Sequence, residues 1–300
     1  MNRLLLHILS LFMLAVVAAI TRPLWLGTTF EWTAVAVLIV VAGIPHGSLD
    51  HLLAQHRNKQ FRLPLYLVVY LLTAGLYLGV WLLFPGIAFL LFLGFTAWHF
   101  GETDFNCFHS GNKAPVLVFV YGSSLTCWLL TQDAALLQQL TALVTRNSPI
   151  AAGLVKYLIQ LPSVAWLLLC SLILLFNSGK GPNSRAATIS FLLFLYLLSH
   201  TSLLLGFVLY FTRWHSLNAL LHIRQEVFRR SGIKTMMQKA VPANLGALLL
   251  LLALGWLSDG AWLKANALPG LFVLLSILTL PHMTEMHRLY RRTEAQAPLT

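Results

Sequence analysis

Hydrophobic residues run through this chain in long stretches that are separated by short polar segments. A membrane-spanning helix needs roughly 20 mainly apolar residues, and stretches near that length recur along the whole sequence. They predict an all-α polytopic transmembrane helix bundle of about ten spans, with eight to ten as the range. The spans are expected near residues 4–20, 32–48, 63–84, 86–101, 114–132, 160–177, 186–201, 203–222, 241–257 and 267–283.

Two of these stretches allow a second interpretation. Residues 186–222 are too long for one upright span, and the polar segment Ser199–Ser202 predicts a break, with one tilted helix as the alternative. Residues 4–20 resemble a signal peptide in charge and length, but no small-residue cleavage site follows them. We interpret them as a span, so that residues 1–300 form a single integral membrane domain.

The composition supports a membrane protein. Residues of the AVILMFWYC set make up 58% of the chain and charged residues only 10%, with a mean hydropathy of +0.77, which excludes an ordinary soluble domain. The net charge of +11 would suit nucleic acid, but in so apolar a chain we interpret Lys and Arg as topology signals. Three cysteines without a CxxC pair indicate neither a disulfide framework nor a zinc ribbon.

The basic residues predict the orientation in the membrane. With ten spans, both termini face the same side, and all but four of the 20 Lys and Arg residues fall on that side. The four on the opposite side are Arg22, Arg146, Lys156 and Lys264. Because cytoplasmic loops carry the excess of Lys and Arg, we expect both termini in the cytoplasm and a multi-pass location in the inner (cytoplasmic) cell membrane.

The histidines give the first indication of chemistry, since there are 11 of them against nine carboxylates. Imidazole is the side chain that binds metals and protons near neutral pH. Four histidines come late in spans that run toward the cytoplasm, namely His46, His99, His215 and His282. The sequence therefore predicts that these four converge at one depth. Single histidines at helix ends are more often interfacial and water-bonded, and we interpret His7, His56, His109 and His287 in that way.

Three of the nine acidic residues follow two of these histidines closely. Asp50 comes one helical turn after His46, and Glu102 and Asp104 follow His99 at the third and fifth positions. A carboxylate beside a histidine can hold the second ring nitrogen and fix the tautomer that a metal requires. We expect Asp50, Glu102 and Asp104 to orient the histidines rather than to bind the metal.

Four motifs in this order resemble a known family: Pro45-His46-Gly47-x-x-Asp50, His99-Phe100-Gly101-x-x-Asp104, Tyr210-Phe211-x-x-x-His215 and Leu280-Pro281-His282. Over about residues 40–285 the chain is similar to the Brp/Blh family of bacterial and archaeal membrane β-carotene 15,15'-dioxygenases. The resemblance implies cleavage of β-carotene, or a related carotenoid, at its central double bond with O2 to give retinal. It also implies non-haem iron, Fe(2+), held by histidines.

The family's iron ligands map onto His46, His99 and His215. The fourth ligand does not carry over, because the position four residues after His215 is Ala219. The next histidine, His222, follows His215 by seven residues, or roughly 10 Å of helix, which is too far for both to bind one ion in a regular helix. His282 is the better fourth ligand by depth, with His222 or no ligand as the alternatives.

A hydrocarbon substrate offers almost nothing to hydrogen-bond, so an apolar tunnel open to membrane lipids would have to select the carotenoid. Two other functions fit the pattern less well. A di-iron lipid hydroxylase or desaturase would carry closely spaced His-x-x-x-His groups, and no such pair occurs here. A non-catalytic relative that binds or transports a carotenoid or retinal is favoured by the missing fourth ligand and disfavoured by the three acids beside the motif histidines.

Overall fold

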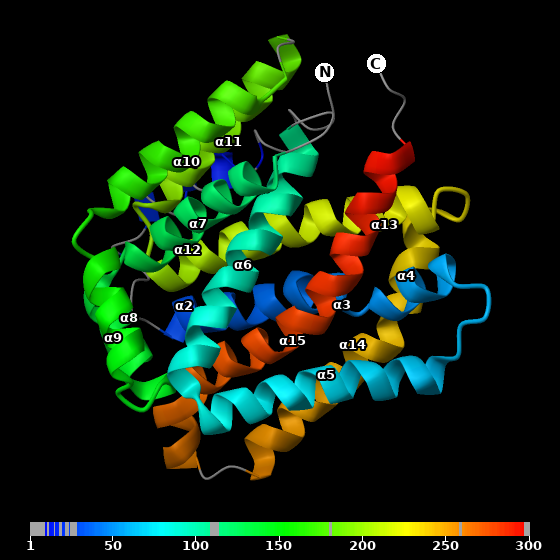
Figure 1. Cartoon of the computed structure of the whole chain (residues 1–300), viewed down its shortest axis with the longest axis horizontal. Helices are drawn as coiled ribbons and strands as arrows, with labels where there is room; N and C mark the ends of the chain where they lie inside the picture. The colour runs from blue at the N-terminus through cyan, green and yellow to red at the C-terminus, as the bar shows by residue number, and fades with distance from the viewer. Residues whose placement is uncertain are drawn as a thin grey trace.

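The computed structural model describes residues 10, 12–14, 16–17, 20–21, 24, 29–108, 114–179, 182–257 and 260–296, except the side chains at 29, 32, 36, 42, 46, 106, 182–184, 250–257, 260–268 and 293–296. Every element in this part of the chain is helical, which confirms the predicted all-α class (Figure 1). The elements are α2 (Thr29–Leu38), η1 (Ile39–Gly43), α3 (Ile44–Gly47), α4 (Asp50–Arg57), α5 (Leu63–Leu83), α6 (Pro85–Phe108), α7 (Pro115–Thr131), α8 (Ala134–Val144), α9 (Pro149–Leu158), α10 (Ser163–Asn177), α11 (Pro182–Leu198), α12 (Leu203–Leu209), η2 (Tyr210–Ser216), α13 (Leu217–Val227), α14 (Gly232–Leu257) and α15 (Gly260–Gln296).

The polar break predicted at Ser199–Ser202 is confirmed. Helix α11 ends at Leu198, and α12 begins at Leu203, where the Ser202 hydroxyl accepts a hydrogen bond from the backbone N–H of Leu205 at 3.1 Å. This is the usual role of serine before the first helical turn. Beyond it, α12, η2 and α13 form one continuous helical run that includes a π-helix.

Among the described residues, two helices are long and apolar enough by themselves to cross a membrane, α5 and the Pro269–Arg292 part of α15. Two helix pairs reach this length only together, α7 with α8, bent by 99°, and α9 with α10, bent by 74°. Helices α8 and α9 lie where no span was predicted, because neither is long enough to span by itself. The described residues thus contain two to four candidate spans, and the count of ten stays a prediction. The first predicted span, 4–20, and both chain ends lie largely outside the described residues.

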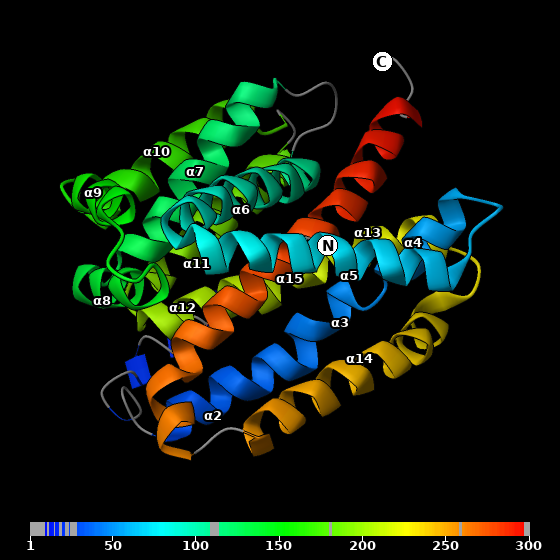
Figure 2. The same cartoon turned by 60° about the horizontal axis from the view of Figure 1, so that its bottom comes forward.

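Three buried apolar clusters hold the described helices together. The first joins α2, α6, α7, α10, α11, α12 and η2 and contains Trp214, and the second joins α4, α13, α14 and α15 and contains Met286. The third joins α5, α6, α8, α9 and α15 and contains Phe89. Helices α6 and α15 take part in two clusters each, and α15 packs against both α5 and α6. In Figure 1 it runs between these two helices, and in Figure 2 it crosses α5. Residues on α6 and α15 are therefore placed where the clusters meet.

Candidate metal centre

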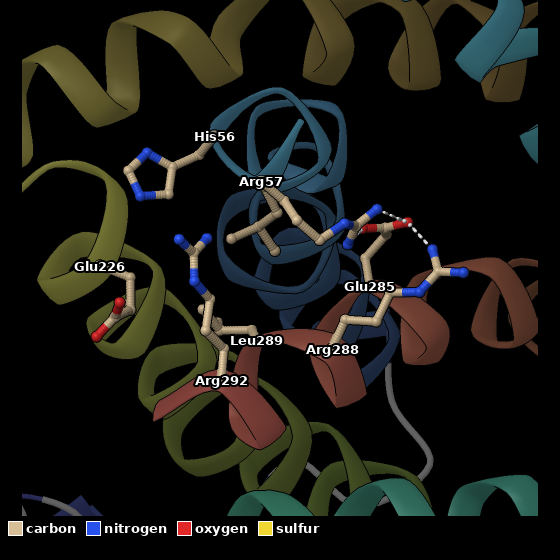
Figure 3. Close-up of a pocket in the computed structure, with 8 residues that line it drawn as sticks. His56, Arg57, Glu226, Glu285, Arg288, Leu289 and Arg292 are labelled. Carbon is tan, nitrogen blue, oxygen red and sulfur yellow. Dashed lines mark hydrogen bonds and ion pairs between the residues drawn. The ribbon is translucent and has the colours of Figure 1, made fainter. Parts of the chain in front are cut away.

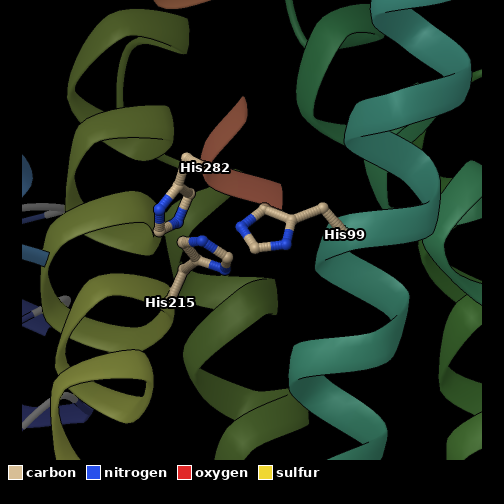
Figure 4. A group of neighbouring side chains, drawn as sticks. All are labelled: His99, His215 and His282. Atoms are coloured by element: carbon tan, nitrogen blue, oxygen red, sulfur yellow. The ribbon is translucent and has the colours of Figure 1, made fainter. Parts of the chain in front are cut away.

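Three histidines from distant parts of the chain meet in the interior of the protein (Figure 4). His99 lies on α6, His215 on η2 and His282 on α15. One ring nitrogen of each lies within 4.8 Å of one from each of the others, and the residues are 2%, 0% and 6% exposed. The rings of His99 and His215 are 4.6 Å apart, and those of His99 and His282 5.1 Å. The structure thus brings together three of the four histidines that the sequence predicts to converge.

This arrangement fits a metal ion. Three atoms no more than 4.8 Å apart have a common point at most about 2.8 Å from each, and metal–nitrogen bonds are about 2.1 Å long. Small rotations of the three rings would shorten the distance from each nitrogen to the common point to the length of a metal–nitrogen bond. Imidazole nitrogens are donors for divalent iron and its neighbours in the first transition series. This is the one group of three or more potential ligands among the described side chains.

Asp50 holds one of these histidines by its second nitrogen. The Nδ1 atom of His282 donates a hydrogen bond to Oδ1 of Asp50 at 2.9 Å and lies 3.1 Å from Oδ2. The hydroxyl of Tyr70 donates to the same carboxylate at 3.3 Å. Because a carboxylate only accepts hydrogen bonds, Nδ1 carries the hydrogen, and Nε2 of His282 keeps its lone pair for a metal. The sequence led us to expect His46 as the partner of Asp50; the observed imidazole belongs to His282.

A second buried carboxylate, Asp104, fixes the π-helix that carries His215. Its Oδ1 accepts a hydrogen bond from Nε1 of Trp214 at 2.7 Å. Its Oδ2 accepts hydrogen bonds from the hydroxyls of Tyr121 at 2.7 Å and Tyr210 at 3.2 Å. Tyr210 and Trp214 both lie in η2, so Asp104 ties η2 to α6 and α7. The π-helix is a rare conformation that is frequent at functional sites, and here two hydrogen bonds from η2 to one carboxylate hold it.

The expectation that Asp104 reaches back to His99 is wrong. Five residues along an α-helix turn the chain by about 500°, which leaves the side chain about 140° from its starting direction. Asp104 therefore faces away from His99 and toward η2. It positions the segment of His215 rather than an imidazole.

Glu102 also contacts a histidine other than the expected one. Its Oε1 accepts a hydrogen bond from Nδ1 of His287 at 2.7 Å. Glu102 is buried, whereas 40% of the His287 side chain is exposed, and the His287 ring lies 6.0 Å from that of Trp98. The interpretation of His287 as a simple water-bonded interfacial residue is therefore wrong. The pair joins α6 to α15 one turn beyond the level of His99 and His282.

The side chain of His46 lies outside the described residues, but its backbone belongs to α3, which directly follows the π-helix η1. A β-carbon added at the next residue, Gly47, would lie 3.8 Å from Nδ1 of His282. Helix α3 therefore passes beside the three histidines.

Ala219 is fully buried in the second apolar cluster. His222 is outside the group of three; its Nδ1 lies 2.9 Å from the carbonyl of Asn218.

Aromatic rings surround the histidine centre on one side. The rings of Phe100 and Phe211 lie 4.8 Å and 5.7 Å from that of His215, and Phe207 stacks on Phe211 at 5.8 Å. A β-carbon added at Gly43 would approach Phe211 to 3.0 Å, so the glycine of η1 leaves the space that this ring needs. The surroundings of the centre are apolar, as a hydrocarbon ligand requires.

Four residues that organise the centre were not assigned from the sequence. Tyr70 and Tyr121 have no spacing relation to any histidine that could have indicated their contacts. Tyr210 and Trp214 stand in the motif around His215, so their proximity was visible but their common partner was not. That one carboxylate accepts hydrogen bonds from three side chains can be seen only in the folded structure.

An all-helical scaffold with a buried group of three histidines that could hold a metal ion, in apolar surroundings, is the arrangement expected of a histidine-ligated metal protein. The comparison with known families agrees. The chain matches the beta-carotene 15,15'-dioxygenase family over residues 37–290 and belongs to that family, which confirms the resemblance to Brp/Blh proteins.

One curated relative is the beta-carotene 15,15'-dioxygenase of the uncultured marine bacterium 66A03. It is 26% identical over 277 residues, which cover 87% of this chain and 94% of the relative. No solved structure shows significant similarity to the chain.

Proposed function

We propose that this protein is an iron-dependent membrane dioxygenase that cleaves β-carotene, or a related carotenoid, at its central double bond to give retinal. The observation that carries the proposal is the group of His99, His215 and His282 in apolar surroundings. Membership of the beta-carotene 15,15'-dioxygenase family supports the substrate class and the reaction.

His99, His215 and His282 would hold the ion, and His46 would approach from α3, where the neighbouring Gly47 borders His282. In this proposal His282 takes the role of the fourth family ligand, which is missing here because position 219 is alanine. Iron(II) would supply the activation of O2, both atoms of which end in the two aldehyde products. Four imidazoles on one ion are consistent with a mononuclear centre, so we expect one iron per chain.

The chain's own residues would orient the ligands and keep water away. Asp50 holds Nδ1 of His282 and so directs Nε2 inward, and Asp104 holds η2, which places His215. Phe100 and Phe211, which pack against His215, would form part of an apolar wall beside a conjugated chain. A polyene has no polar group to recognise, so selection would rest on the shape of this apolar wall.

The apolar helices support a location in the membrane, where the carotenoid dissolves. Only 17% of the most apolar stretch of α5 is buried inside the protein, and its exposed apolar side chains suit lipid. We propose that the protein is a multi-pass protein of the cytoplasmic membrane, with the histidine centre toward the cytoplasmic side, because the Lys and Arg residues concentrate on that side.

Expression in cells that accumulate β-carotene should remove the orange colour and produce retinal, because central cleavage yields two molecules of this aldehyde. Chromatography of extracts against retinal standards measures both changes, with cells that carry an empty vector as the control. Loss of carotenoid with aldehydes of other chain lengths would contradict central cleavage. Unchanged carotenoid in cells that contain folded, iron-loaded protein would contradict the proposed reaction.

Replacing Asp50 by asparagine should lower iron occupancy or turnover roughly 10- to 100-fold without abolishing either. The amide still accepts a hydrogen bond from Nδ1 of His282 but no longer carries the charge that strengthens it, and losses of such outer partners cost about this much. Iron content and retinal formation are measured on the purified protein. A loss as complete as that of a ligand variant would make Asp50 a ligand, and no change would leave the Asp50–His282 bond without a role.

A further inference from the structure

A groove of about 340 Å³ lies beside the metal centre, between the α4–α5 connection, the first turns of α5 and the Pro281–Arg288 part of α15. We call it the basic groove and define it by Arg57, Arg62, Tyr66, Tyr70, Glu285 and Arg288. Tyr70 forms its inner wall and donates to Asp50. The groove is therefore separate from the histidine centre but adjoins its outer contacts.

The groove carries surplus positive charge. Three arginines line it against one carboxylate, Glu285. Glu285 is already engaged, with Arg57 at 2.6 Å and 3.3 Å and with Arg288 at 2.8 Å (Figure 3). The side chain of Arg62 has no hydrogen bond or ion pair with the described residues and is exposed. An anion that entered the groove would thus meet the unpaired guanidinium of Arg62. It would also meet those of Arg57 and Arg288, whose two positive charges are balanced by Glu285 alone.

One wall of the groove is apolar and continues onto the outside of α5. Leu65 and Val69 line it and are 62% and 55% exposed, on a helix that is long and apolar enough to cross a membrane. Tyr66 also lines the groove, and its hydroxyl is buried and has no hydrogen-bond partner among the described residues. A buried hydroxyl without a partner is unfavourable, so a ligand that accepts a hydrogen bond at this point would be stabilised.

We propose that the basic groove binds one anionic phospholipid. The phosphodiester lies between Arg62 and Arg288 and accepts a hydrogen bond from Tyr66, and the first part of an acyl chain follows Leu65 and Val69. Basic pockets between membrane helices on the cytoplasmic side bind such headgroups, and arginine suits phosphate oxygens in particular. The proposal rests on the membrane location proposed above. It does not depend on the dioxygenase activity, because the arginines would bind a charged lipid and not the uncharged carotenoid.

The test measures bound lipid by native mass spectrometry of the full-length protein in detergent. Dioleoyl phosphatidylglycerol and dioleoyl phosphatidylcholine are added in separate series, and inorganic phosphate forms a third. We expect the phosphatidylglycerol adduct to be about fivefold or more tighter than the phosphatidylcholine adduct, as expected for a basic residue near an anionic lipid surface.

Two variants and one control make the test specific. Arg62→Gln should remove most of the preference for phosphatidylglycerol, and Tyr66→Phe should reduce it by a smaller factor. Arg229→Gln, at an exposed arginine outside the groove, should leave it unchanged. Equal binding of the two lipids, or the same loss in Arg229→Gln as in Arg62→Gln, would overturn the proposal. Inorganic phosphate that competes as well as phosphatidylglycerol would show a site for small anions instead. Retinal formation, measured on the same samples, tests the proposed enzyme separately.

Discussion

Replacing His99 by alanine is expected to remove bound iron and to abolish retinal formation together. The ring of His99 lies 4.6 Å from that of His215 and 5.1 Å from that of His282. Without it, two described imidazoles remain, too few to retain a divalent ion against detergent and buffer. Iron is measured by elemental analysis of the purified protein, and retinal by chromatography.

The loss has to be separated from misfolding, since His99 is buried. His99→Gln keeps most of the side-chain volume and should lose iron as completely as the alanine variant, with an unchanged helical circular dichroism spectrum. His200→Ala is the matched control, because His200 is an exposed histidine whose ring packs on Tyr196; it should keep both iron and activity. One iron per chain in a folded His99→Ala protein would remove His99 from the proposed ligand set.

Replacing Gly122 by alanine should destabilise the protein by about 3 kcal/mol or more and reduce its iron content as well. A β-carbon at Gly122 would lie 1.8 Å from the carbonyl oxygen of Ala97, and one at Gly101 2.3 Å from that of Val118. The α6 and α7 backbones are thus in direct contact, as in membrane helix pairs that pack through small residues. An added methyl group must push the helices apart, and overpacking of this kind typically costs 1–3 kcal/mol and occasionally more. Because α6 carries His99, its displacement also opens the metal centre.

The control is Gly79→Ala on α5, where a β-carbon would meet nothing within 4 Å. Alanine is the better helix former by about 1 kcal/mol, so this variant should be as stable as the parent or more so. Thermal unfolding in detergent, followed by circular dichroism, compares the two. If Gly122→Ala unfolded at the parent's temperature, the close contact between α6 and α7 would not limit stability.

The sequence was sufficient for the helical class and for the grouping of three histidines. Long apolar stretches set the class, and the alternation of span direction placed His99, His215 and His282 at one depth. That argument uses only position along a span, which an apolar pattern contains. It does not depend on contacts between particular side chains, so errors at helix ends had little effect on it.

The sequence was insufficient for the partners of the carboxylates and for the course of the chain between spans. Asp50 bonds to a histidine 232 positions away, and no local spacing contains that information. Asp104 was assigned to the wrong side of its helix because spacing alone drew attention to the nearest histidine. The bends at α7–α8 and α9–α10 were missed because an apolar pattern describes length rather than direction.

The π-helix η2 has a consequence for comparing relatives. A π-helix holds nearly one residue more per turn than an α-helix, so η2 acts like a single-residue insertion within the helical run. Deleting one residue between Tyr210 and Ser216 would turn α13 by about 100° and present a different side of it to the centre. Insertions and deletions in this segment, more than substitutions, would therefore change which residues of α13 can reach the histidine centre. The face of α13 that is turned toward the centre is therefore set by the number of residues in η2.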